Sequence, residues 1–127
     1  MKKPVDKSIT VALGRQKLFA YEDGQVRFEF DCVSGDISHP TEPGLFRITR
    51  KARFYTSQTY KVPMNYAMFF TNDGKAIHES HVVGPLSLLK SLGIDSVGSH
   101  GCVRLAHEDA VELFDWAPIG TPVRVQY

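Results

Sequence analysis

The pattern that most constrains the fold is a strict alternation of apolar and polar side chains over residues 26–32. The order of the side chains is Val26, Arg27, Phe28, Glu29, Phe30, Asp31 and Cys32. Successive side chains of a strand point to opposite faces of a sheet, so this segment predicts a strand with one buried face. Cys32 falls on the apolar side of the pattern, and we therefore predict that it fills the core.

Shorter alternating segments cover residues 9–13, 46–48 and 123–127, and residues 18–21 and the apolar run 66–71 are further strand candidates. Asp23-Gly24 predicts a hairpin before residues 26–32, and Asn72-Asp73-Gly74 predicts a second one over residues 66–78. Residues 50–63 have poor periodicity and are interpreted as a loop with local structure. Apolar spacing predicts a helix over 106–117, ended by Pro118 and Gly120, and a short one that opens at Pro85 and stops at Gly93. The fold class predicted is mainly β, a sandwich or open barrel of short strands with one or two helices.

Composition bounds the classes of protein that fit. The 127 residues suffice for one domain over 1–127, and 43% hydrophobic and 23% charged residues are typical of a globular protein. A net charge of +1 leaves no basic footprint for nucleic acid. No apolar run reaches the length of a membrane span, and no apolar signal segment follows the charged start. We therefore expect a cytoplasmic protein, or a periplasmic one if a signal was removed; the oligomeric state is not predicted.

The run Ser99-His100-Gly101-Cys102-Val103-Arg104-Leu105 concentrates reactive groups. A cysteine attacks as the thiolate, and its ordinary pKa of about 8.5 must be lowered by a cation, a base or a helix N-terminus. All three are plausible around Cys102. A disulfide with Cys32 is also possible from the count of two cysteines, and it would abolish the thiol chemistry.

Four segments together form a recognisable pattern: Ser99 to Leu105, Ala76-Ile77-His78, Asp109-Ala110 with Leu113, and Gly120-Thr121-Pro122-Val123. With the early Asp23-Gly24 hairpin, this pattern resembles the L,D-transpeptidase catalytic domain, also called the YkuD domain, over nearly the whole chain. Three departures stand out. The family's threonine-proline turn reads Thr41-Glu42-Pro43-Gly44, the glycine usual after the histidine is Glu79, and the connection 79–98 is longer than usual.

The resemblance implies a cysteine enzyme that acts on peptidoglycan stem tetrapeptides or muropeptides, without a metal or other cofactor. Cys102 is then the nucleophile and His78 its base, with the backbone N–H groups around Gly101 and Cys102 as oxyanion hole. His100 and Ser99 shape and polarise this turn, and Arg104 either holds a substrate carboxylate or stiffens the loop. Tyr66 and His81 are further expected substrate contacts. His81 is the alternative base, because its distance along the chain from Cys102 is closer to the family's.

Two other classes of protein compete with this hypothesis. His78, Glu79, His81 and His100 could ligate a metal, but His78-Glu79-Ser80-His81 is one residue short of the zinc-binding H-E-x-x-H spacing and lies at a strand end. A non-catalytic module that binds peptidoglycan would keep the fold and lose the thiol chemistry. Within the enzyme class, the acyl acceptor is either water, which gives an L,D-carboxypeptidase of cell-wall recycling, or an amine, which gives 3-3 crosslinks or protein attachment. From the expected compartment we predict water.

Overall fold

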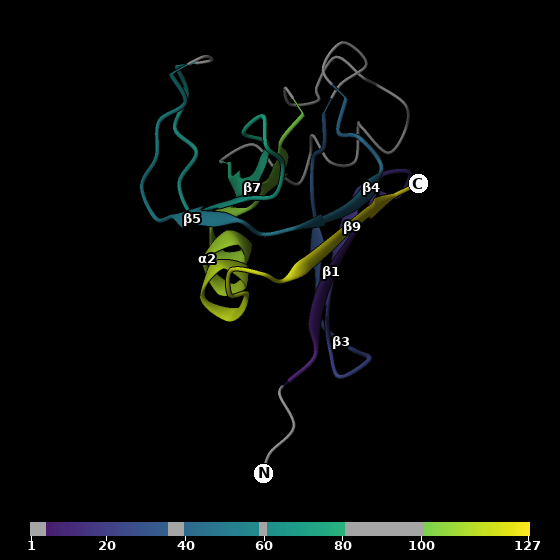
Figure 1. The fold of residues 1–127 in the computed structure, drawn as a ribbon. Coiled ribbons are helices and arrows are strands. Elements are labelled where there is room, and N and C mark those ends of the chain that lie inside the picture. The colour runs from purple at the N-terminus through teal and green to yellow at the C-terminus, as the bar shows by residue number, and fades with distance from the viewer. Residues whose placement is uncertain (1–4, 36–39, 59–60, 81–100) are drawn as a thin grey trace.

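The computed structural model describes residues 5–35, 40–58, 61–80 and 101–127, which form two β-sheets and a helix (Figure 1). The strands of the first sheet lie in the order β3-β2-β1-β9-β4, and those of the second in the order β5-β6-β7-β8. The bounds are β1 Lys7–Ala12, β2 Lys17–Glu22, β3 Gln25–Asp31, β4 Gly44–Arg47, β5 Arg50–Ala52, β6 Ala67–Phe69, β7 Ala76–Glu79, β8 Val103–Leu105, α2 His107–Trp116 and β9 Pro122–Gln126. The predicted mainly-β class is confirmed.

The main core joins the first sheet, one face of the second sheet and helix α2. Its members are buried apolar side chains from strands of both sheets and from α2, among them Ile9, Leu18, Met68, Ile77, Leu105, Leu113 and Val123. Helix α2 buries Ala110 and Leu113 against this core. In Figure 1 the helix lies beside β5 and β7. Cys32 belongs to the same core and is fully buried, as its place in the alternation predicts.

A second, smaller cluster covers the opposite face of the second sheet. It contains Met64, Ala67, Phe69 and Ala76, with the partly buried Cys102 packed against it. Side chains of β6 and β7 therefore alternate between the two clusters, as strand geometry requires. Cys102 lies on the face that points away from the main core.

The two predicted hairpins are present, and so is the predicted late helix. Asp23 and Gly24 both have positive φ, 52° and 83°, as a two-residue type I′ turn requires. The pairing of β6 with β7 confirms the second hairpin. The short helix expected between Pro85 and Gly93 lies outside the described residues.

Two details of the strand predictions are wrong. Val26 does not share the buried face of β3: its side chain is 55% exposed, because the register of β2 and β3 shifts after Ala20 and leaves Arg27 as an extra residue. Residues 50–63 are not only loop, since β5 pairs with β6. The described part of the chain holds no helix that is both long and apolar enough to cross a membrane.

Candidate active site

The parallel pairing of β7 with β8 brings the predicted nucleophile, Cys102, and its predicted base, His78, onto one face of the second sheet. Ile77 lies opposite Val103 and His78 opposite Arg104 in the register. Continued by one residue, this register brings Cys102 beside Ala76. Because side chains of paired residues point to the same face, Ala76, His78, Cys102 and Arg104 share one face, while Ile77 and Val103 enter the main core.

His78 is held in one tautomer by the backbone of the next residue. Its Nδ1 lies 2.7 Å from the carbonyl oxygen of Glu79, and since a carbonyl oxygen only accepts, Nδ1 carries the proton. The remaining ring nitrogen, Nε2, is then the atom that can accept a proton. The side chain is 5% exposed, and burial lowers its pKa to about 4, an effect that the nearby Arg104 guanidinium reinforces.

The side chain of Glu79 is held in place on the face of β7 opposite to His78. Its carboxylate contacts Nδ1 of His107, the first residue of α2, and the ring of His107 packs edge-on against Tyr66. The peptide carbonyl that orients His78 thus belongs to a residue anchored to the helix. A glycine at this position could not make such an anchor.

Several groups around Cys102 act on the thiol in opposite directions. The pKa of the thiol is raised overall. Burial raises it most and the Asp73 carboxylate adds to this, whereas a hydrogen bond from the backbone of Ala76 and the positive charges of Lys75 and Arg104 lower it. The cations are therefore the stabilising partners of a thiolate. The helix N-terminus considered from the sequence does not take part, because β8 separates Cys102 from the start of α2 at His107.

Gly101 adopts a backbone conformation that favours glycine. Its φ is +96°, and a Cβ added there would lie 2.6 Å from Cε of Lys75 and 3.4 Å from the carbonyl oxygen of Pro40. The lysine side chain therefore runs across the face of the glycine and reaches the thiol region. Lys75 also pairs with Asp73, whose carboxylate oxygen lies 3.5 Å from its Nζ.

A family model of the L,D-transpeptidase catalytic domain, YkuD, matches residues 6–125. The chain belongs to this family. Among curated proteins it is similar to the probable L,D-transpeptidase 3 of Mycobacterium tuberculosis, with 29% identity over 104 residues that cover 72% of this chain and 36% of that protein.

Solved structures show the same relationship. An L,D-transpeptidase from Stackebrandtia nassauensis has 28% identity and a TM-score of 0.81, over 98% of this chain and 57% of that one. The avibactam carbamoyl enzyme of Ldtfm has 35% identity and a TM-score of 0.79, over 94% of this chain and 48% of that one. The chain thus spans between about a third and three fifths of the length of these relatives.

The predicted site residues of this L,D-transpeptidase domain divide into three groups. His78, Gly101, Cys102 and Arg104 lie together on β7, β8 and the turn before β8. Tyr66 is apart from them: it packs on the main core, its ring centroid 5.6 Å from that of Phe114 in α2, so this geometry gives no support to its predicted substrate contact. His81, Ser99 and His100 lie outside the described residues, and their roles stay predictions.

Sequence reasoning missed Lys75 and Ala76 as partners of the thiol. Both precede His78 on the chain, and only the pairing of β7 with β8 brings them to Cys102. Both cysteines of the chain are thiols, so the disulfide left open from the sequence is not formed. Among the described residues, no group of three or more His, Cys, Asp or Glu side chains could hold a metal ion.

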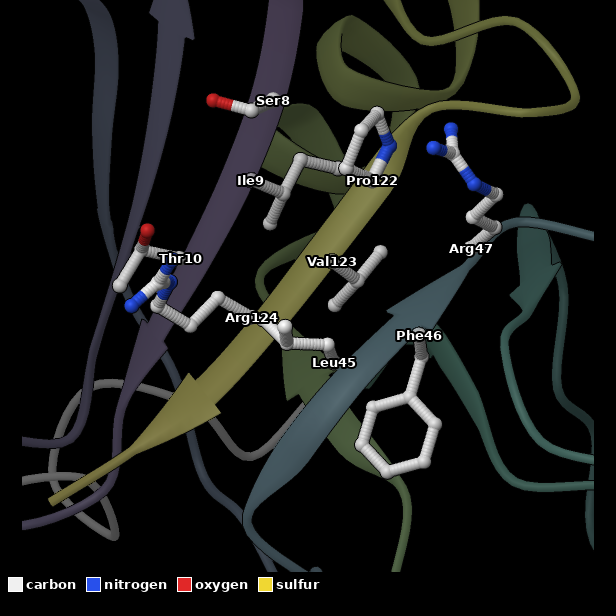
Figure 2. A pocket seen from close by; sticks show the side chains of 9 residues that line it. All are labelled: Ser8, Ile9, Thr10, Leu45, Phe46, Arg47, Pro122, Val123 and Arg124. Atoms are coloured by element: carbon white, nitrogen blue, oxygen red, sulfur yellow. The ribbon is translucent and has the colours of Figure 1, made fainter.

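An open depression on the first sheet is separate from this site. Figure 2 shows side chains of β1, β4 and β9 around it, including Thr10, Leu45 and Arg124. None of its lining residues comes from β7, β8 or the turn before β8. The depression therefore contains neither Cys102 nor His78.

Proposed function

We propose that this domain is a cysteine acyltransferase that acts on peptidoglycan stem tetrapeptides and cleaves the bond between meso-diaminopimelate and the terminal D-alanine. The observation that carries the proposal is the shared face of β7 and β8, from which the Cys102 thiol and the buried His78 ring both project. Membership of the L,D-transpeptidase family supports the same chemistry. So does Ldtfm, which forms a carbamoyl enzyme with avibactam.

The first half-reaction follows from the tautomer of His78. Sγ of Cys102 attacks the carbonyl carbon, its proton passes to Nε2 of His78, and the carbonyl oxygen becomes an oxyanion held by backbone N–H groups at Gly101 and Cys102. Collapse of this intermediate breaks the C–N bond. The proton on Nε2 goes to the leaving nitrogen of D-alanine, and a thioester remains on Cys102.

Before the sulfur attacks, the Cys102 thiol and the His78 imidazole are both neutral. Burial raises the pKa of Cys102 and lowers that of His78, so the proton moves only when the sulfur attacks. Lys75 and Arg104 favour negative charge at this site, which suits both the attacking sulfur and a substrate carboxylate. We propose that Arg104 binds that carboxylate.

For the second half-reaction we propose water as the acceptor. Water adds to the thioester carbonyl, the thiolate leaves and is reprotonated, and a tripeptide is released, which makes the domain an L,D-carboxypeptidase. The alternative acceptor is the amine of another stem or of a protein, which would give a crosslink or an attachment. Both acceptors use the same thioester intermediate, so the product that is released identifies the acceptor.

Mass spectrometry after incubation with a carbapenem tests the thiol chemistry. We expect one covalent adduct on Cys102 and none on Cys102→Ser. Absence of the adduct from the wild-type chain would favour a non-catalytic module that binds peptidoglycan. His78→Ala and His81→Ala, measured side by side, test the base: we expect His78→Ala to abolish acylation, and loss in His81→Ala alone would overturn that assignment.

Incubation with a disaccharide-tetrapeptide tests the acceptor. We expect disaccharide-tripeptide and D-alanine in equal amounts, without dimers. Accumulation of crosslinked dimer would show an amine acceptor and overturn the hydrolytic part of the proposal, while leaving the thioester step intact.

A further inference from the structure

We propose that Thr41 is a positioning residue that sets the direction of the Cys102 backbone N–H toward the substrate oxyanion. The inference rests on the proposed function, because an oxyanion forms only if Cys102 is acylated. Thr41 lies sixty-one positions before Cys102, and nothing in its local sequence gives it a catalytic task.

The hydroxyl of Thr41 makes two hydrogen bonds in a buried setting. Its Oγ1 donates to the carbonyl oxygen of Gly101 at 2.9 Å and accepts from the backbone N–H of Gly35 at 2.8 Å. The residue is 4% exposed, so little water competes for these bonds. Because a carbonyl oxygen can only accept, the hydroxyl proton must point at Gly101.

Because Thr41 fixes the direction of the Gly101 carbonyl, it also fixes the direction of the Cys102 N–H in the same peptide group. The bond between Gly101 and Cys102 is trans, and in a planar trans peptide the C=O and the following N–H point in opposite directions. Thr41 holds the carbonyl on its own side, so the N–H of Cys102 points away from Thr41. Gly101 is a residue whose backbone could otherwise turn with little resistance, as the positive φ of +96° illustrates.

The segment 33–35, which hydrogen-bonds to Thr41 through Gly35, is itself held by the rest of the fold. Val33 and Arg104 exchange two backbone hydrogen bonds, of 3.0 and 2.9 Å, so the chain before Gly35 is paired with the chain after Cys102. The buried side chain of Gln16 holds Ser34 through its backbone N–H at 3.0 Å and its hydroxyl at 2.8 Å. Thr41 therefore connects the turn at Gly101 to a fixed support rather than to a freely moving loop.

The test separates oxyanion stabilisation from thiol reactivity. Acylation of Cys102 by a carbapenem passes through an oxyanion, whereas alkylation by iodoacetamide displaces iodide and forms none. For Thr41→Val, which removes the hydroxyl and keeps the shape, we expect acylation to slow about 10- to 100-fold and alkylation to stay within about twofold. Thr41→Ser, which restores the hydroxyl, should recover most of the acylation rate.

Thr121→Val is the matched control. Thr121 is also 4% exposed, and its hydroxyl donates to the carbonyl oxygen of Pro118 at 2.7 Å, on the segment that precedes β9. Its loss should leave the ratio of the acylation rate to the alkylation rate at the wild-type value. If Thr41→Val does not fold, Thr41→Ala removes the same hydroxyl and the same ratio is measured.

The inference is overturned if both rates of the Thr41 variants fall together, if neither falls, or if Thr41→Ser is as slow as Thr41→Val. Failure of the proposed function has a different signature. In that case the wild-type chain itself forms no adduct with the carbapenem while iodoacetamide still labels Cys102, and the inference fails with it.

Discussion

At the scale of single residues, the two thiols differ in how far they are buried and in the charges around them. Cys32 is fully buried, which raises its pKa to about 12, whereas Cys102 is half-buried and has two cations nearby. We expect iodoacetamide to label the native chain once, on Cys102, and to reach Cys32 only in guanidinium chloride. Intact-mass measurement with peptide mapping checks this. Labelling of Cys32 in the native chain would show that the main core opens more readily than its packing indicates.

The buried imidazole has a consequence for the pH dependence of acylation. With the pKa of His78 lowered to about 4, the ring stays neutral and able to accept a proton throughout the range above that pH. We expect the rate of carbapenem acylation to stay level from pH 7 to pH 5 and to fall to half near pH 4. Stopped-flow rates, with fluorescence at each pH to verify folding, give the profile. If the acylation rate instead fell to half near pH 6.5, the His78 ring would be exposed to water.

The candidate site residues that the structure brings together could be selected from the sequence, but most of their partners could not. Cys102, Gly101 and His78 lie in short local motifs, so neighbouring residues identify them. Lys75 and Thr41 carry no such signature. Lys75 reaches the turn before β8 through the pairing of β7 with β8. Thr41 reaches it through a hydrogen bond that spans sixty positions of the chain.

At the scale of elements, local turn chemistry explains why the hairpins were predictable and two short strands were not. Asp23 and Gly24 specify their turn by residue type alone. Strands β5 and β8 have three residues each, too few for a period of two to be visible, and unlike the equally short β6 they do not lie in a continuous apolar run. Strand β8 is defined by its partners, β7 on one side and the bridge to Val33 on the other.

The turn before β8 offers a comparison between two glycines of similar backbone. Gly101 and Gly74 have φ values of +96° and +92°, but only at Gly101 would a Cβ meet another atom, the Cε of Lys75. We expect Gly101→Ala and Gly74→Ala each to lower the free energy of unfolding by about 1–2 kcal/mol through backbone strain. Chemical denaturation measures that change.

Only Gly101→Ala should displace Lys75 and thereby move a positive charge that lowers the pKa of the Cys102 thiol. Its rate of alkylation at pH 7 should therefore fall several-fold, while that of Gly74→Ala stays at the wild-type value. Lys75→Met should reproduce the slower rate without the loss of stability. Equal alkylation rates in all four proteins would exclude Lys75 as a partner of the thiol.

At the scale of the whole molecule, the predicted class of fold needed only periodicity, but the arrangement of the sheets depends on contacts between distant parts of the chain. Strand β1 pairs in parallel with β9, so the two ends of the described chain meet in the middle of the first sheet. The parallel pair of β7 and β8 is equally nonlocal. Alternation shows which side chains are buried and not which strand is the neighbour, so neither pair follows from the sequence.

His78 also links the site to the stability of the whole molecule. Its pKa is about 4 in the folded chain and 6.5 in a model peptide, so between these values the unfolded chain binds more protons. The free energy of unfolding is then highest above pH 6.5 and falls as the pH drops toward 4, by about 3 kcal/mol in total for this group. Urea denaturation at several pH values measures the slope. His78→Gln cannot take up this proton, so its stability should vary less over the same window. Equal slopes in the two proteins would mean that His78 is protonated as easily in the folded chain as in the unfolded one. The ring would then be charged at low pH and could not accept a proton there.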